Sequence, residues 1–371
     1  MKEQSMEKTK RESSIYDVKS PIQLGEVLKN EPEPKFYWRG IEDVSFGYFF
    51  GPSKSGKTIF SENLAMSLAT GRNQFFGSEL IAEPKKVLIA NFEENYRNRT
   101  RRMNNQMKSL TEEECKLFNG NVLLSAQDFP RFLYSKEDWK GFENLVNLKK
   151  PNVVIVDSLT RIVNADITSR DACKDVLARL RNLAYDNSIC LIVIHHANKL
   201  SGGPLTMESM AGSSVMSQEA DFSIGFNWNQ VTNERYLKEV FYRYVEPKDM
   251  VLTYEISNDT NWLIPKESKF EHKVISNLGE ESASYYDMVI DYLESKAVEN
   301  NKVTEELEYF EIRSSELKRE FVSNNTIPSR SFDYTLRNVV KNGVLTPKGP
   351  KGNYVYDLSK EQLTQVAQQN E

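Results

Sequence analysis

Cysteine and histidine are both scarce in this chain, and their scarcity excludes two classes of fold. Only three of the 371 residues are cysteine and three are histidine, and Cys115, Cys173 and Cys190 form no CxxC pair. A disulfide framework needs more cysteines, and a structural zinc site needs closely spaced ligands. The composition therefore indicates a reducing compartment and a fold that disulfides do not support.

Long apolar runs and an excess of positive charge are missing as well. The longest apolar runs, such as 153–156 and 190–194, have the length of strands, whereas a membrane-spanning helix needs about 20 residues. The first residues are charged and lack the apolar segment of a signal peptide. The net charge of −5 argues against a uniformly basic binder but leaves room for local basic patches. We expect a cytoplasmic protein without membrane contact.

The sequence does contain a regular alternation of strand and helix patterns. Apolar residues make up 39% of the chain, and its length favours two domains. Continuous apolar runs rich in β-branched residues alternate with amphipathic segments, which is typical of a parallel sheet covered on both faces. We predict an α/β domain over 36–265. Its expected strands are 46–50, 87–90, 153–156 and 190–194, and its expected helices are 58–70, 97–107 and 170–185.

Outside this region the pattern changes. Residues 1–35 are predicted to form a disordered tail and linker, because 1–19 are polar and charged and 31–34 read EPEP. Residues 266–281 are polar and predict a second linker. Three helices, 284–297, 314–322 and 329–341, and two strands within 344–357 follow, which is the order of a winged helix. That domain is expected over 282–360, with a tail at 361–371.

A glycine-rich motif follows the first strand of the α/β region. Residues 51–58 read GPSKSGKT and match GxxxxGK[ST], with a strand before and a helix after. Backbone N–H groups of such a loop and the partial positive charge of the helix N-terminus bind phosphate. Lys57 would bridge the β- and γ-phosphates of ATP, and the Thr58 hydroxyl would ligate Mg²⁺. The predicted ATP-binding residues are Gly51, Ser53, Ser55, Gly56, Lys57 and Thr58.

Asp157 directly follows the apolar strand 153–156. A strand that ends in aspartate is common, because aspartate often caps the next helix. The carboxyl ends of parallel strands share one edge of a sheet, however, so Asp157 is expected near the phosphate loop. Together with Thr58 it predicts the Mg²⁺ site.

Motifs of this kind resemble those of the RecA-like ATPases. In that group the glutamate that activates water ends the strand beside the aspartate strand. Here Asp157 is followed by Ser158, so the resemblance directs the search to the strand 87–90, which leads into Glu93 and Glu94. We predict Glu93 as the catalytic base, with Glu94 as the alternate. A solvated acidic turn before a helix is the competing interpretation.

The strand that begins at Cys190 ends in a pair of histidines. Adjacent residues on a strand point to opposite faces, so His195 and His196 are poorly placed to ligate one metal ion. A polar side chain at this edge can contact the γ-phosphate and report its hydrolysis. We assign this sensor role to His196, with a structural role as the alternative.

The order of the motifs resembles that of the RepA-type hexameric helicases, which are plasmid replication ATPases with phage and mobile-element relatives. The resemblance covers about 36–265 and rests on GPSKSGKT, NFEENYRNRTRRM, VVIVDSLTRI, IHHANK and AGSSVMSQEAD. It implies that Glu93 is the base, that Arg102 is a recurrent family arginine and that His196 is the sensor. It also implies a loop at 198–210, including Lys199, that faces single-stranded DNA in a ring channel; an ordinary solvent loop is the alternative.

One position departs from this family. RepA-type rings carry an arginine after the Gly-Ser-Ser segment that reaches the ATP site of the neighbouring subunit. The corresponding residues here, 218–221, read QEAD and contain no arginine. Arg243, in the later strand candidate KEVFYRY, is predicted to replace it and to act in catalysis from the neighbouring subunit.

The C-terminal region carries a local excess of positive charge. Between Arg313 and Gly352 there are eight Lys and Arg against three Asp and Glu, a net charge of +5. Such a surface suits duplex DNA, although many winged helices bind proteins instead. The predicted DNA contacts of this region are Arg330, Arg337 and Lys341 on the helix 329–341, and Lys348 and Lys351 near the turn between the strands.

These expectations combine into a DNA-associated ATPase that forms a ring, expected to be a hexamer, and that moves or opens DNA during replication of a plasmid, phage or mobile element. The resemblance implies single-stranded DNA in the channel, and the local positive charge of the predicted winged helix indicates duplex DNA there. Two alternatives stay open. One is a non-translocating ATP switch that binds DNA, and the other is a recombination mediator that forms filaments.

Overall fold

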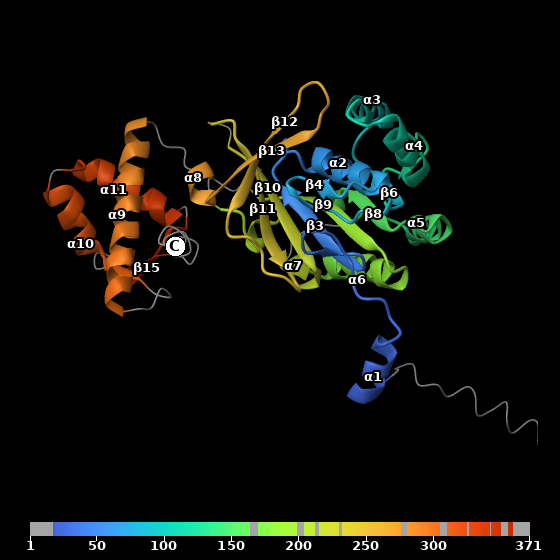
Figure 1. The fold of residues 1–371 in the computed structure, drawn as a ribbon, viewed down its shortest axis with the longest axis horizontal. Helices are drawn as coiled ribbons and strands as arrows, with labels where there is room; N and C mark the ends of the chain where they lie inside the picture. The colour runs from blue at the N-terminus through green and yellow to red at the C-terminus, as the bar shows by residue number, and fades with distance from the viewer. Residues whose placement is uncertain are drawn as a thin grey trace, which may run out of the picture. The chain divides into compact units, whose positions relative to one another are not determined.

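The computed structural model describes most of the chain, in two units that run over Met1–Lys35 and Phe36–Glu371 (Figure 1). The described residues are 18–163, 170–198, 204–211, 215–229, 232–275, 280–304, 310–324, 326–341, 343–349 and 355–358. Two predicted DNA contacts, Lys199 and Lys351, lie outside them. Of the predicted loop at 198–210, residues 199–203 lie outside them as well. Within these ranges no helix is both long and apolar enough to cross a membrane.

The first unit contains one helix that the sequence prediction missed. Helix α1 (Pro21–Leu28) begins with a capping box, in which Ser20 and Gln23 each accept a hydrogen bond from the other's backbone N–H. Pro21 occupies the first turn, where its missing N–H costs nothing. This part of the predicted linker is therefore helical. The prediction of disorder for 1–19 falls almost wholly outside the described residues.

The second unit is built on a nine-stranded sheet in the order β13-β12-β11-β10-β3-β9-β8-β6-β7. Six neighbouring strands run parallel, namely β10, β3, β9, β8, β6 and β7. Strands β11, β12 and β13 extend the sheet beyond β10 with antiparallel pairing. Its strands are β3 (Ser45–Gly51), β6 (Val87–Asn91), β7 (Val122–Leu124), β8 (Val153–Asp157), β9 (Cys190–His196), β10 (Phe222–Trp228), β11 (Arg235–Tyr242), β12 (Val251–Ile256) and β13 (Leu263–Lys269). The predicted central parallel sheet is confirmed, as a RecA-like P-loop core requires.

Helices cover both faces of this sheet (Figure 1). They are α2 (Lys57–Thr70), α3 (Tyr96–Met107) and α4 (Glu112–Asn121) on one face, and α5 (Lys136–Lys149), α6 (Arg170–Asp186) and α7 (Val215–Glu219) on the other. Alternate residues of β8 serve the two layers, since Ile155 packs with the α2 cluster and Val154 with the α6 cluster. This explains the continuous apolar run at 153–156.

The predicted linker at 266–281 differs from the structure. Strand β13 continues to Lys269, and helix α8 (Glu271–Ile275) packs against the core. Glu271 is buried and accepts hydrogen bonds from the backbone N–H of Leu205 at 2.7 Å and from the Tyr236 hydroxyl at 2.8 Å. The α/β core therefore extends at least to Ile275. The prediction failed because β13 is an edge strand whose polar side chains are mostly exposed, which removes the apolar alternation.

The C-terminal module has a hydrophobic cluster of its own, which includes Leu293, Leu317, Phe332 and Tyr356. Its elements are α9 (Glu280–Thr304), β14 (Glu311–Arg313), α10 (Ser314–Lys318), a π-helical turn (Arg319–Ser323), α11 (Ser329–Lys341), β15 (Leu345–Lys348) and β16 (Val355–Leu358). The three predicted helices and two strands are present, and β14 adds a third strand to a sheet in the order β14-β16-β15.

Smaller elements complete the description. They are the two-stranded pairs β1 (Phe36–Trp38) with β2 (Ile41–Glu42) and β4 (Gln74–Phe75) with β5 (Ser78–Glu79), and 3₁₀ turns at Leu159–Arg161 and Met207–Ser209.

Candidate active site

The phosphate loop joins the end of β3 to the start of α2. Gly56 has φ of 100°, a left-handed conformation that favours glycine, and offers no side chain to cap the helix. The first N–H groups of a helix have no intrahelical partner, so at α2 they remain available as donors to an anion. The loop therefore has the geometry that phosphate binding requires.

Gly51 is needed for a reason that the motif does not express. A Cβ atom at this position would lie 2.0 Å from the backbone carbonyl oxygen of Phe226 on β10. Any larger residue would push the sheet apart at the point where the loop begins. Ser55 is buried, and its hydroxyl donates to the Pro52 carbonyl at 2.8 Å, so it shapes the loop, whereas Ser53 is exposed.

Lys57 is held against the loop itself. Its Nζ donates to the backbone carbonyls of Gly51 at 2.9 Å and Pro52 at 2.8 Å. Burial lowers the pKa of Lys57 to about 8, and the charges of Asp157 and Glu93 oppose this shift. The ammonium group is therefore fixed beside the phosphate-binding N–H groups.

Asp157 lies at the end of β8, and its carboxylate meets the start of α2 although β9 separates β8 from β3. The Thr58 hydroxyl donates to Asp157 Oδ2 at 3.0 Å, and Asn91 Nδ2 donates to the same oxygen at 3.1 Å. Burial raises the pKa of Asp157 to about 7, and the charge of Glu93 adds to this. A hydroxyl and a carboxylate are oxygen ligands of the kind Mg²⁺ prefers, and a bound cation would favour the ionised carboxylate. Thr58 and Asp157 thus fit the predicted Mg²⁺ site.

Glu93 and Glu94 are adjacent in sequence but have different surroundings. Oε1 of Glu93 lies 3.5 Å from Nε2 of His196. Hydrogen bonding by His196, and to a lesser extent by Ser158, lowers the pKa of Glu93, while partial burial opposes the shift. Glu93 is therefore ionised near neutral pH and lies at the edge of the sheet where Asp157 ends.

Glu94 is instead bound to Arg102. Arg102 donates to Glu94 Oε2 at 2.6 Å and to Glu62 Oε1 at 2.7 Å, and Glu62 is buried on α2. This ion-pair network ties α3 to α2 and occupies the Glu94 carboxylate. Of the two acids, the geometry favours Glu93 as the base and gives Arg102 a structural contact.

Asn91 was missed in the sequence analysis. Its side-chain oxygen accepts hydrogen bonds from the backbone N–H groups of Glu93 at 3.0 Å and Glu94 at 2.7 Å, while its Nδ2 contacts Asp157. One buried amide therefore positions both the base candidate and the metal-ligand candidate. The available signal was a single polar residue at the end of an otherwise apolar strand.

The two histidines at the end of β9 have separate environments. His195 is buried, and its Nε2 hydrogen-bonds to the carbonyl of Ala211. Burial lowers the pKa of His195 to about 4. His196 is partly exposed and contacts Glu93. The two rings therefore have different partners, the Ala211 carbonyl for His195 and the Glu93 carboxylate for His196.

Arg243 lies just beyond β11 and far from the phosphate loop of its own chain. Its Nε donates to Asp221 Oδ1 at 2.7 Å, and Asp221 Oδ2 accepts from the Phe46 N–H at the start of β3. Arg243 is thus at the amino edge of the parallel sheet, whereas Gly51 is at the carboxyl edge. Any contact of Arg243 with an ATP site must be made with another copy of the chain.

The basic residues of α11 share one exposed face. Arg330, Arg337 and Lys341 are exposed, while Phe332 and Leu336 are buried in the module. Lys348 differs, because its ammonium group pairs with Asp357 and lies 3.5 Å from Glu311 Oε1. Its charge is therefore partly neutralised within the module, which the sequence prediction did not anticipate.

Comparison with known proteins gives one sequence match and several similar folds. A family model described as an AAA domain matches residues 13–202, more than half of the chain. Among the curated proteins no sequence match was found. The chain is similar to a solved structure described as the ATPase domain of G40P, at 12% identity and a TM-score of 0.49, over 68% of this chain and 100% of that chain.

A second solved structure, described as a DnaB-like replicative helicase and its interactions with primase, is 11% identical with a TM-score of 0.49. It covers 72% of this chain and 71% of that chain. The match to the AAA domain model includes the phosphate loop, Glu93, Asp157 and His196. The chain belongs to the AAA domain family.

Proposed function

We propose that this protein hydrolyses ATP and uses the reaction to move or open DNA, as a ring-forming helicase-like motor in the replication of a plasmid, phage or mobile element. The observation that carries the proposal is the meeting of five side chains at one edge of the sheet. They are Lys57, Thr58, Glu93, Asp157 and His196, and they come from four separate segments of the chain.

The roles in hydrolysis follow from these contacts. The N–H groups of α2 and the Lys57 ammonium bind the phosphates, and Glu93 accepts the proton of the attacking water. His196 holds the Glu93 carboxylate and couples its position to the γ-phosphate. Bond formation between the water oxygen and the γ-phosphorus accompanies cleavage of the bond to ADP.

Thr58 and Asp157 would hold Mg²⁺, which neutralises the charge that develops on the phosphates. Asn91 keeps the Asp157 carboxylate oriented through Nδ2 and fixes the turn that carries Glu93. A rotation of this one side chain would therefore disturb both the metal ligand and the base.

The DNA part of the proposal rests on the C-terminal module. Its order of helix, strand, two helices and two strands is that of a winged helix, and we assign α11 as the recognition helix. Arg330, Arg337 and Lys341 would contact duplex DNA. A protein-binding winged helix is the competing assignment, and salt-insensitive binding to duplex DNA, or none at low salt, would favour it.

The ring part rests on Arg243. Because this residue lies at the sheet edge opposite to its own phosphate loop, head-to-tail assembly of copies could bring it to a neighbour's ATP site. We assign it as the residue that completes catalysis there, in a hexamer.

A non-translocating ATP switch is the second candidate, and the Arg243–Asp221 ion pair favours it. If Asp221 retains Arg243, the chain would bind ATP and DNA without continuous turnover. A helicase would separate a forked duplex with ATP, whereas a switch would bind the same fork without unwinding it. Strand displacement by a sized oligomer, with ATPase rates measured with and without single-stranded DNA, therefore tests the proposal. No unwinding and no stimulation by DNA would reject it.

A further inference from the structure

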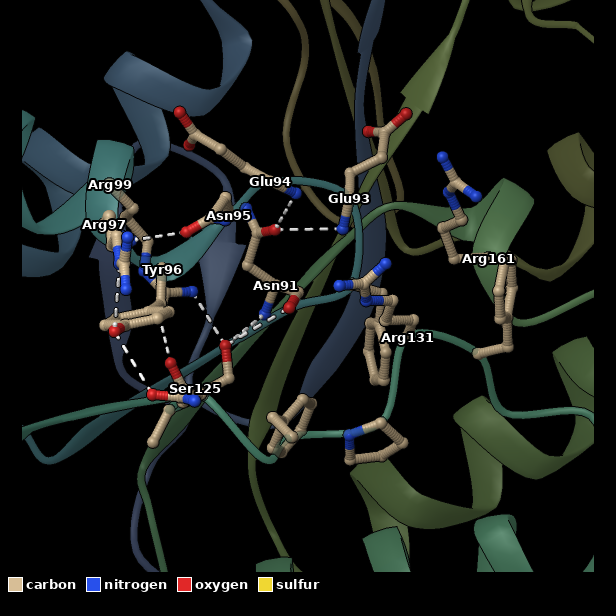
Figure 2. Close-up of a pocket in the computed structure, with 16 residues that line it drawn as sticks. Asn91, Glu93, Glu94, Asn95, Tyr96, Arg97, Arg99, Ser125, Arg131 and Arg161 are labelled. Carbon is tan, nitrogen blue, oxygen red and sulfur yellow. Dashed lines mark hydrogen bonds between the residues drawn. The ribbon is translucent and has the colours of Figure 1, made fainter.

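A pocket of about 600 Å³ opens beside Glu93 at the carboxyl ends of β6 and β7 (Figure 2). Arg99 and Ser125 are among its buried lining residues, and the guanidinium of Arg99 donates to Ser125 Oγ at 2.7 Å. The phosphate loop does not line it. The pocket is therefore a separate space adjacent to the ATP site, large enough for a drug-sized ligand.

The charge of this pocket is positive. Arg131 and Arg161 lie together on one side, and Arg97 lies on the other (Figure 2). Counting Arg99, four arginines stand against two glutamates, and one of these, Glu94, is already paired with Arg102. An anionic ligand would therefore meet guanidinium groups that can each donate to phosphate oxygens.

Aromatic rings accompany the arginines. Phe132 lines the pocket, and its ring lies 4.9 Å from that of Tyr134; the two residues remain 38% and 40% exposed. The Arg161 guanidinium lies over the Phe132 ring at 5.2 Å, and Arg97 lies near the Tyr96 ring at 5.8 Å. Exposed rings next to arginines are the features that bind unpaired bases and the phosphates between them.

Two amide side chains of the lining add hydrogen-bonding capacity. Asn95 and Gln127 line the pocket, and both are exposed. A simple inorganic anion would use the arginines but neither the rings nor the amides. A ligand with bases, sugars and phosphates would use all three kinds of group.

We propose that this pocket, together with the exposed Tyr134 ring that packs against its lining residue Phe132, binds a segment of single-stranded nucleic acid, with phosphates on Arg131 and Arg161 and bases against the two rings. The proposal rests on the proposed function, since it names a place on the ATPase core where single-stranded nucleic acid is bound. It differs from the predicted contacts at the loop 198–210 and at α11. Nucleic acid bound in this pocket lies beside Glu93, so binding of the nucleic acid can influence ATP hydrolysis directly.

The test measures binding of a fluorescently labelled oligodeoxythymidine to the full chain by anisotropy, over a range of salt concentrations. Arg131→Glu is expected to weaken binding about tenfold or more, and Arg131→Ala to reduce the slope of log affinity against log salt by about 0.7 for each lost phosphate contact. Phe132→Ala is expected to weaken binding at least about fivefold, because loss of one base-stacking contact costs about that much. Arg131→Lys should recover most of the affinity.

Lys149→Ala is the matched control. Lys149 is also exposed, but it ends α5 just before β8 begins, at the opposite edge of the sheet from the pocket. Its removal changes the net charge by the same amount as Arg131→Ala and should leave the affinity unchanged. Equal losses in both variants would mean that only the overall charge matters and would overturn the proposal.

Wild-type strand displacement, measured in parallel, separates the two ideas. If the wild type unwinds DNA while Arg131→Glu and Phe132→Ala bind the oligonucleotide normally, the pocket proposal fails and the proposed function stands. If the wild type binds the oligonucleotide through the pocket without unwinding, the proposed function fails and the pocket proposal stands. If Arg131→Glu changes self-association in sedimentation but not oligonucleotide affinity, the pocket is an interface between copies, and the proposal is overturned.

Discussion

The ATP site of the core and the basic face of α11 use polar side chains in opposite ways. In the core, Lys57, Asn91 and Asp157 are buried, and each has a specific hydrogen-bond partner. On α11, Arg330, Arg337 and Lys341 are exposed. Buried polar groups interact in a medium of low dielectric, where each contact is strong and strictly oriented, whereas solvent and salt screen exposed charges.

This difference predicts how the two regions respond to substitution. Loss of one side chain from the core site should remove the chemistry almost completely, because the remaining groups cannot take over its orientation. Loss of one cation from α11 should weaken binding only modestly, because exposed charges contribute nearly independently. The predictions below test this contrast, starting with the largest effect.

Arg243 is an exception to this rule, because it is partly exposed and we nevertheless predict that its loss has a very large effect on ATP hydrolysis. Arg243→Ala should lower the ATPase rate of the assembled protein by roughly 10³-fold or more, as loss of a trans-acting arginine does, and leave nucleotide affinity nearly intact. The measurement is steady-state ATPase activity of the sized oligomer together with binding of a fluorescent ATP analogue.

Arg181→Ala is the control for Arg243→Ala. Arg181 lies 4.0 Å from the same Asp221 and pairs with Glu219 at 3.1 Å. If both variants lose activity equally, the effect comes from the environment of Asp221 and not from a trans-acting arginine. Survival of turnover in Arg243→Ala would show that the assignment is wrong.

Glu93 and Glu94 allow the same substitution to be compared at two adjacent positions of the core. Glu93→Gln should lower the turnover number by about 10²- to 10⁴-fold, because it removes a general base. Glu94→Gln makes the same chemical change one residue away but weakens the Arg102 network, so it should mainly lower thermal stability. Single-turnover hydrolysis and thermal unfolding of both variants check this. A normal turnover number in Glu93→Gln would contradict the choice of base.

His195 predicts how the free energy of unfolding of the core depends on pH. Burial lowers its pKa to about 4, whereas the unfolded chain has the ordinary value of 6.5. Between these values the unfolded state binds a proton that the folded state does not, so stability should fall as the pH falls from 6.5 towards 4. The loss from this group should reach about 3 kcal/mol at most.

Urea unfolding followed by tryptophan fluorescence measures this effect in the core alone. All four tryptophans, at positions 38, 139, 228 and 262, lie within the ATPase core. In His195→Phe the free energy of unfolding should depend less on pH over this range. Parallel curves for wild type and variant would mean that the His195 ring is not the titrating group.

The smallest effect is expected on α11. Arg337→Ala with Lys341→Ala should weaken duplex binding by the full chain only several-fold and reduce the salt slope by about 0.9 for each lost phosphate contact. Lys348→Ala is a useful comparison, because its ammonium group already pairs with Asp357 and Glu311, and it should have a smaller effect. If these substitutions abolished DNA binding as completely as Glu93→Gln abolishes catalysis, the expected difference between the buried and the exposed region would be wrong.

Much of the core could be predicted from sequence because its signals are local. The run 153–156 is continuously apolar since helices cover both faces of the sheet, and the motif at 51–58 carries its own strand and helix context. Strand β13 and helix α8 were missed because an exposed edge strand has no apolar alternation. Helix α1 was missed although its capping box is visible at Ser20 and Gln23.

The sequence by itself determined the phosphate loop, the parallel strands and the short set of acids that could serve ATP. Local spacing and side-chain chemistry suffice for these, because each depends on residues close together in the chain. Only the tertiary structure decided which acid faces the site: His196 lies beside Glu93, whereas Arg102 and Glu62 hold Glu94. It also placed Arg243 at the far edge of the sheet and joined Arg131 and Arg161 in one pocket. Such placements depend on strand order, which brings together residues that are distant in sequence.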